Sequence, residues 1–246
     1  MKQKQILTVL FCAVSTTFTV TAQTPPLLNV ARVQVKPDKV GEYMDAEKQY
    51  SAAFKKGGGT LRVFYRSTAG NPFEFLMIAG EPNYAAHDDK SYYAKGATEA
   101  DLVRMAARRA QCVDSVRLTY ERAQPELGFS PPGTPQPKTV TVVRVNVHPD
   151  MIQQWMATVK NELVPAWKKA GQPGMLARRV EYGGSRNQFT IRVPLSKWAD
   201  LDGEGPLVKA LGQDGAAKLG AKLSSMSNAE WLVYNYVPEM SVLPPQ

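Results

Sequence analysis

The feature of this sequence that most constrains its fold is an internal repeat. Arg32–Asp38 (Arg-Val-Gln-Val-Lys-Pro-Asp) recurs as Arg144–Asp150 (Arg-Val-Asn-Val-His-Pro-Asp), and Ala53–Gly58 recurs as Ala166–Gly171. The matched segments keep a nearly constant separation over a whole domain length, which chance rarely produces. We therefore predict that the chain contains one folding unit twice.

The first residues have the pattern of an export signal. Lys2 and Lys4 give a positive start, Ile6–Val14 is an apolar run, and Ala22 ends a typical cleavage sequence. The apolar run is shorter than the ~20 residues of a membrane-spanning helix. We expect residues 1–22 to be a cleaved signal peptide, no stable membrane span after cleavage, and an exported protein that is periplasmic or extracellular.

Cysteine content and charge narrow the class of protein. Removal of the signal leaves Cys112 as the one thiol, so no internal disulfide can form and packing must stabilise each unit. Cys112 could bridge two chains, although a lone buried thiol is the commoner arrangement. The formal net charge is +8, and the densest basic cluster, from Arg104 to Arg122, is expected to be a solvated helix face. We predict no nucleic-acid partner.

Each unit has the same order of predicted elements. In the second unit, Val140–Val147 is β-branched at nearly every position, and apolar residues from Ile152 to Trp167 then recur at helical spacing, with Pro165 expected to kink the helix. Two strands, a helical region and a last strand follow at Leu176–Tyr182, Gln188–Val193, Ser196–Met226 and Trp231–Val237. This order, β-α-β-β-α-β, is that of the ferredoxin-like unit.

The first unit repeats this order, and a stiff proline-rich stretch separates the two units. We predict an α+β fold with two tandem ferredoxin-like domains. The first covers residues 27–127 and the second covers residues 139–242, with a linker over residues 128–138.

The start of the first helix in each unit carries a family resemblance. Val35–Lys39 (Val-Lys-Pro-Asp-Lys) and Val147–Met151 (Val-His-Pro-Asp-Met) each open an amphipathic helix that ends in an aromatic residue, two lysines and glycine. The pattern resembles the dimeric α/β-barrel superfamily, which includes the antibiotic-biosynthesis-monooxygenase-like proteins. The resemblance implies that two ferredoxin-like sheets enclose a pocket, usually across a dimer. A tandem repeat implies that one chain could close the barrel alone, so intramolecular closure and a homodimer both stay open.

Strand alternation predicts which side chains point into such a barrel. On the first strand Ala31, Val33 and Val35 share the apolar face and should pack on the helices, so Arg32 and Gln34 should point inside. The same division of the matching strands completes the set of interior polar residues. This set is Arg32, Gln34, Glu74, Arg144, Asn146 and Arg192.

Several arginines inside a barrel need compensation, because a buried guanidinium group is costly unless it is paired or meets an anion. We therefore predict that these residues bind a small-molecule ligand that is anionic or aromatic. The alternative is that the arginines lie on a wetted sheet face or pair with Glu74 and Glu181.

Signals for catalysis are few. His87 lies at a helix start and His148 at a strand end, where capping and contact with solvent explain them better than a metal. The acidic stretch Asp200–Gly205 lacks the closing glutamate of a calcium loop. We predict no metal and no cofactor, and the sequence assigns no catalytic residue. The resemblance alone implies the alternative function, a cofactor-independent monooxygenase or isomerase.

Overall fold

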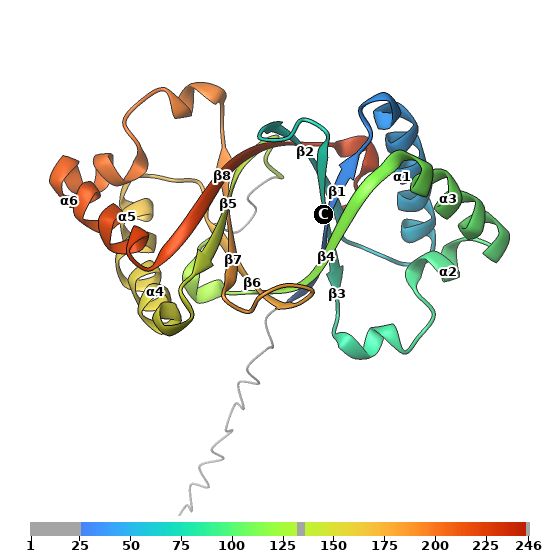
Figure 1. Cartoon of the computed structure of the whole chain (residues 1–246), viewed down its shortest axis with the longest axis horizontal. Helices are drawn as coiled ribbons and strands as arrows, with labels where there is room; N and C mark the ends of the chain where they lie inside the picture. The colour runs from blue at the N-terminus through green and yellow to red at the C-terminus, as the bar shows by residue number, and fades with distance from the viewer. Residues whose placement is uncertain (1–25, 132–135, 245–246) are drawn as a thin grey trace, which may run out of the picture.

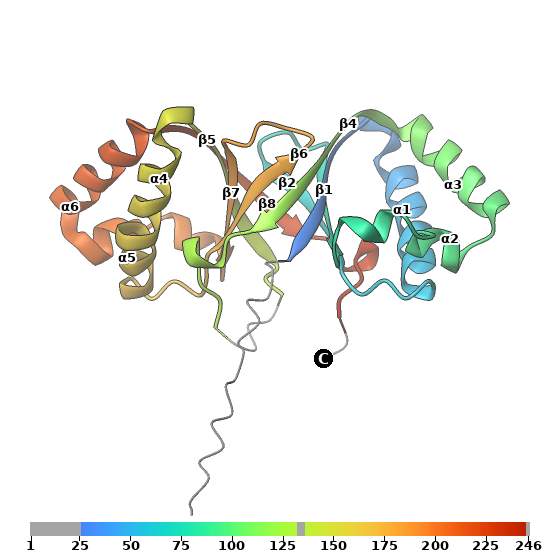
Figure 2. The same cartoon turned by 90° about the horizontal axis from the view of Figure 1, so that it is seen from below.

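The computed structural model describes residues 26–131 and 136–244, and the expected signal peptide lies outside them. Within the described residues, eight strands form one closed barrel in the order β1-β3-β2-β8-β5-β7-β6-β4. The helices lie in two groups on opposite sides of this barrel (Figures 1 and 2). The fold is therefore α+β, and the barrel closes within one chain.

The first half of the chain supplies four strands and three α-helices. They are β1 (Leu27–Val35), α1 (Val40–Lys56), β2 (Arg62–Ala69), β3 (Glu74–Glu81), α2 (Tyr92–Gly96), α3 (Glu99–Cys112) and β4 (Val113–Ala123). The second half supplies β5 (Thr139–Val147), α4 (Ile152–Thr158), α5 (Val164–Lys169), β6 (Leu176–Tyr182), β7 (Gln188–Leu195), α6 (Pro206–Ser224) and β8 (Ser227–Tyr236). None of the described helices is long and apolar enough to cross a membrane.

Each half contributes a block of four neighbouring strands to the barrel. The blocks are β4-β1-β3-β2 and β6-β7-β5-β8, and all the pairings are antiparallel. The pairs β2–β8 and β4–β6 join the two blocks into a closed cylinder. The strand order is ferredoxin-like in each block, while the division into two tandem domains stays a prediction.

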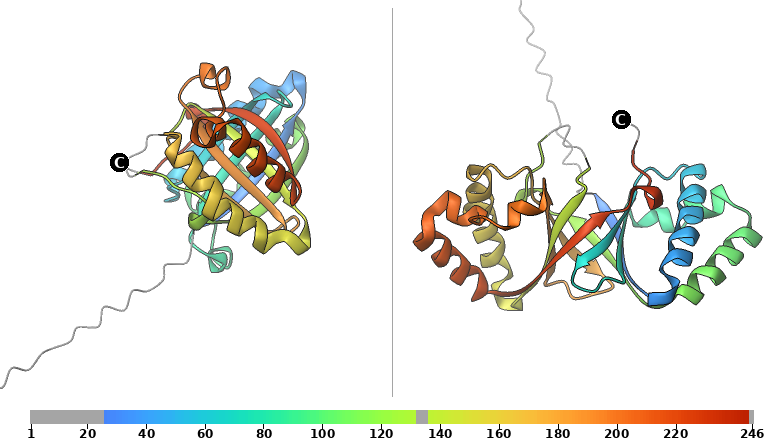
Figure 3. Two further views of the ribbon diagram at one scale, coloured as in Figure 1. Left: turned by 90° about the vertical axis from the view of Figure 1, so that its left-hand side faces the viewer. Right: turned by 90° about the horizontal axis from the view of Figure 1, so that it is seen from above.

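The apolar faces of the strands pack outward under the helices. Val33 and Phe75 form one cluster with Tyr43 of α1, and Phe189 packs on Trp155 of α4 with 4.7 Å between the ring centroids. Figure 3 shows the two helix groups covering opposite sides of the barrel. The alternation expected for these strands is confirmed. Because their apolar faces contact the helices, their polar faces point into the barrel.

The helix expected from Ile152 to Trp167 is interrupted. A π-helical turn, Val159–Leu163, separates α4 from α5. Pro165 follows directly, and its ring would meet the carbonyl of Asn161 in a regular α-helix. The widened turn relieves that clash, so the expected kink is a local change in helix type.

A buried ion-pair network ties α1 to β2 and α3. Glu47 is fully buried, Arg62 is 3% exposed, and an Arg62 η-nitrogen donates to the Glu47 carboxylate at 2.5 Å. Arg109 approaches the other Glu47 oxygen at 2.7 Å, and the Tyr93 hydroxyl accepts from Arg62 Nε at 2.9 Å. One buried carboxylate therefore contacts two arginines, of which Arg62 is buried and Arg109 is partly exposed.

We expect Glu47→Gln to lower the free energy of unfolding by about 3–5 kcal/mol, because it leaves Arg62 buried without a counter-charge. Urea unfolding followed by circular dichroism measures this loss. Glu42→Gln on the same helix is the matched control, since it removes only the exposed pair with Lys39 and should cost less than about 1 kcal/mol. Equal losses in the two variants would contradict the assigned role of Glu47.

A second ion pair crosses the junction between β4 and β6. Arg122 holds the two Glu181 oxygens at 2.7 and 2.9 Å, and the Tyr84 hydroxyl donates to Glu181 at 2.6 Å. The bond to Arg122 lowers the pKa of Glu181. Burial and the bond to Glu181 raise the pKa of Tyr84 to about 12.

This pairing gives a pH dependence of stability with a defined sign. Because the folded-state pKa of Glu181 lies below the unfolded value of about 4.3, its contribution is present above that pH and is lost as the pH falls through the folded value. We expect the melting temperature of the wild type to exceed that of Glu181→Gln at pH 7 and the difference to shrink at pH 3. Glu126→Gln, which alters an exposed carboxylate, serves as control. A difference that does not change with pH would refute the assignment.

Candidate ligand-binding site

A cavity of about 150 Å³ lies inside the barrel, towards the end where β1 and β5 finish. Its polar lining consists of Arg32, Arg117, Thr119, Glu121, Arg144, Asn146, Arg178, Gln188 and Thr190. Val30, Leu76 and Val142 add an apolar wall that continues into the apolar cluster filling the middle of the barrel. An apolar protein cavity of this volume holds a molecule as large as benzene. The cavity therefore has room for one small ligand.

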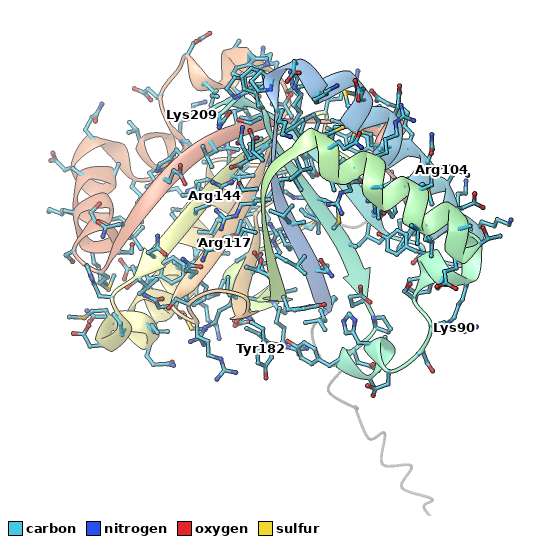
Figure 4. All side chains as sticks on the ribbon, turned by 45° about the vertical axis from the view of Figure 1, so that its right-hand side comes forward. Lys90, Arg104, Arg117, Arg144, Tyr182 and Lys209 are labelled. Carbon is cyan, nitrogen blue, oxygen red and sulfur yellow. The ribbon has the colours of Figure 1, made fainter. Side chains whose placement is uncertain are left out.

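The lining side chains come from the inward faces of several strands. Arg32 lies opposite Arg117 across the β1–β4 pair, and Asn146 lies opposite Gln188 across the β5–β7 pair. Figure 4 shows Arg117 and Arg144 between the strands of the two halves. The site is thus built from residues that are far apart in the sequence.

Arg144 is compensated by its protein neighbours. It donates to the Glu74 carboxylate and, at 2.5 Å, to the Tyr234 hydroxyl, which in turn donates to Glu74. Glu230 lies 3.3 Å from another Arg144 nitrogen. Burial raises the pKa of Tyr234, and its hydrogen bond to Glu74 acts in the same direction. Arg144 therefore forms a neutralised wall of the cavity.

Arg32 has a different environment, although it occupies the equivalent position of the repeat. Within the described residues its guanidinium group has no hydrogen bond or ion pair to a protein group. Burial lowers the pKa of Arg32, and the positive charges of Arg144 and Arg117 lower it further. Like charges that lie directly opposite each other on paired strands are destabilising. The negative charges of Glu74 and Glu121 act on the pKa of Arg32 in the opposite direction and are the smaller contributions. The Arg32–Arg117 pair is therefore a positive centre without an ion-pair partner among the described residues.

Arg178 is a second incompletely satisfied cation. It is 5% exposed, and its Nε lies 3.5 Å from a Glu121 oxygen. Glu121 also accepts a hydrogen bond of 3.0 Å from Thr119. In the part of the chain that the structure describes, both η-nitrogens of Arg178 are buried without a hydrogen-bond acceptor. A buried donor without an acceptor costs about 1–3 kcal/mol, and more when it is charged.

The six residues predicted from the sequence fall into three groups. Arg32, Arg144 and Asn146 line the cavity, and Glu74 contacts it through Arg144. Gln34 lies near the end of β1, where it accepts a hydrogen bond from Asn71 at 2.8 Å.

Arg192 also faces the interior, but it does not line this cavity. It donates to the Tyr65 hydroxyl at 2.5 Å, and Gln136 donates to the same hydroxyl. Arg192 therefore belongs to a polar contact outside the cavity lining, although the positive charge of Arg178 contributes to lowering its pKa. Ligand binding by any of the six residues stays a prediction.

Sequence analysis missed Arg117, Glu121 and Arg178, which lie on the inward faces of β4 and β6. Alternation along Val116–Arg122 places Arg117, Thr119 and Glu121 on one face, and this signal could have identified two of the three. The expectation that the basic cluster is a solvated helix face was wrong about the element for Arg117, which lies on β4 and lines the cavity with an exposed side chain.

Two other candidate positions have ordinary surroundings. His87 packs edge-on against the Tyr120 ring at 5.2 Å, and the Cys112 thiol is buried and contacts the Arg108 carbonyl at 3.3 Å. Among the described residues, no three His, Cys, Asp or Glu side chains come together as a metal-ligand set.

Solved structures of other proteins share the fold of this chain. No protein-family model and no curated protein sequence matches the chain. Among solved structures, a putative monooxygenase from Fusobacterium nucleatum subsp. nucleatum matches with a TM-score of 0.62 and 13% identity, over 89% of this chain and 95% of that chain. A putative monooxygenase from Lactobacillus acidophilus NCFM matches with a TM-score of 0.59 and 13% identity, over 89% and 96%.

An anthrone oxidase-like protein matches in the same way, with a TM-score of 0.59 and 12% identity over 87% of this chain and 92% of that chain. At identities this low, the matches show a shared fold and carry no information about a shared activity. Together with the closed barrel and its two helix groups, they confirm the resemblance seen in the sequence. The chain has the fold of the dimeric α/β-barrel superfamily.

Proposed function

We propose that this protein binds a small anionic ligand, of the carboxylate class, in the cavity inside the barrel. The carrying observation is that Arg32 and the η-nitrogens of Arg178 line or adjoin this cavity without protein partners in the described residues. An anion would compensate both groups at once. The apolar wall around Val30 and Val142 suits a short hydrocarbon or aromatic part of the same ligand.

The proposal includes an arrangement in two tandem ferredoxin-like domains, residues 27–127 and 139–242, and export after removal of residues 1–22. The constant spacing of the repeat and the signal-like start of the chain support these two points. Since the barrel closes within one chain, the cavity needs no second subunit. A homodimer therefore stays an untested expectation.

The alternative function is a cofactor-independent monooxygenase or isomerase. It is favoured by the shared fold with two putative monooxygenases and an anthrone oxidase-like protein. The Glu74–Tyr234 hydrogen bond beside the cavity is a contact through which a proton could move. Incubating a bound ligand with the protein and oxygen, without added cofactor, separates the two functions. Oxygen uptake or a new product would support the enzyme, and unchanged ligand would support binding alone.

The binding proposal is tested by thermal-shift titration with small aliphatic and aromatic carboxylates. A carboxylate at a hundred times its dissociation constant should add about 2.7 kcal/mol to the stability of the wild type, and Arg32→Met should abolish that gain. The same substitution should stabilise the unliganded protein, because it removes the repulsion between Arg32 and Arg117.

The control is Arg104→Met, whose side chain is 72% exposed on α3 and which should leave the titration unchanged. A shift that persists in Arg32→Met would place the ligand elsewhere. No shift with any carboxylate would count against the binding function itself.

A further inference from the structure

The repeat-related strands β1 and β5 have differently charged neighbours at equivalent positions. Arg144 of β5 lies opposite Glu230 of β8, whereas its equivalent in β1, Arg32, lies opposite Arg117 of β4. At the next inward position, Gln34 lies opposite Glu74, whereas Asn146 lies opposite the neutral Gln188. Each side therefore has one acid in register, but the Glu74 carboxylate beside β1 pairs with Arg144 of β5, so that among the described residues Arg32 has no ion-pair partner.

The arginines that line the cavity differ in their ion-pair partners. Arg144 is balanced by Glu74 and Glu230, and Glu121 is the one carboxylate near Arg178 among the described residues that line the cavity. Arg32 and Arg117 keep their charges. Arg117 has only a weak hydrogen bond of 3.4 Å to the side-chain oxygen of Gln188. The lining arginines and these three carboxylates leave a net positive charge, and two separate groups, Arg32 and the η-nitrogens of Arg178, have no acceptor among the described residues.

The unsatisfied donors form two centres at different depths. Arg32 and Arg117 lie near the end of the barrel, beside Asn146 and Gln188. Arg178 lies deeper, since its partner in the β4–β6 register is Ala123, well beyond Arg117 along β4. The apolar side chains Val30, Leu76 and Val142 line the same cavity. Such an arrangement matches an elongated ligand with a charged group at each end and a short apolar middle.

The deeper centre also has the geometry for a carboxylate. The two η-nitrogens of a guanidinium group form a planar fork that holds both oxygens of one carboxylate. In Arg178 these are the atoms that have no acceptor in the described residues, while Nε faces Glu121. The volume of about 150 Å³ limits the ligand to about six to eight non-hydrogen atoms.

We propose that the ligand is a short dicarboxylate, with one carboxylate on the fork of Arg178 and the other between Arg32 and Arg117. This inference rests on the proposed anion-binding function and names its ligand class. Aliphatic dicarboxylates of about three or four carbons meet the size limit and offer an acceptor group to each centre.

Isothermal titration calorimetry of the full chain tests the charge requirement with isosteric ligands. Succinate and malonate are compared with their half-amides, which keep the shape and lose one charge. We expect the better dicarboxylate to bind at least about tenfold more tightly than its half-amide, the factor typical of a charge-assisted hydrogen bond. Equal affinity for the two forms would overturn the dicarboxylate inference and leave the anion-binding function standing. Failure of every anion to bind would overturn both.

Sulfate and phosphate distinguish a two-ended ligand from a compact oxyanion. We expect both to bind more weakly than the dicarboxylate, because neither can reach the two centres together. Binding of sulfate as tight as that of the dicarboxylate, in competition with it, would overturn the inference.

Variants locate the two carboxylates. Arg178→Lys and Arg117→Gln should each bring the affinity ratio of dicarboxylate to half-amide towards one, and Arg104→Gln should leave the ratio unchanged. Arg178→Lys keeps the buried positive charge beside Glu121 and loses only the fork, which protects the fold, and circular dichroism verifies that the variants are folded. A ratio that is unaffected in both variants would overturn the placement.

Discussion

The pairing of β2 with β8 and of β4 with β6 is the constraint on which the rest of the structure depends. These two junctions convert two open sheets into a barrel without exposed strand edges. Closure also encloses the polar faces of both sheets. An arginine that points inward is then costly unless a counter-charge lies within reach across the barrel. Arg144 finds Glu74 from the other half, and without closure these two groups would not meet.

Buried arginines have different partners under the helices and inside the barrel. Beneath the helices of the first half, the buried Arg62 has a direct ion pair with Glu47, which also lies 2.7 Å from Arg109. Inside the barrel, Arg32 and Arg178 keep donors that no described protein group satisfies. A fold that only needed stability would replace such side chains with apolar ones of similar volume, which is often neutral or stabilising. Both arginines line the same cavity, and this favours a ligand as their partner.

Much of the fold was predictable, because its signals are local. The repeat, the element order and the inward direction of Arg32 and Arg144 follow from spacing and from alternation within single strands. The roles of Arg117, Glu121 and Arg178 depend on the register of β4 against β1 and β6, which a single strand does not encode. The different places of Arg144 and Arg192 likewise depend on contacts across the barrel, with Glu74 in one case and Tyr65 in the other.

The hydrogen bonding of the acids argues for binding over proton chemistry inside the barrel. Glu74 accepts from both Arg144 and Tyr234, and Glu121 accepts from Thr119 and faces Arg178. A general base needs a carboxylate oxygen that can reach a substrate proton. Glu74 would first have to give up a charge-assisted contact, and the Glu121 oxygen that has no hydrogen-bond partner among the described residues is buried and faces Arg178 at 3.5 Å. Arg32 and Arg178 are in the opposite condition, since they have donors without an acceptor among the described residues. The lumen therefore presents donors for an anion more readily than it presents a base for catalysis.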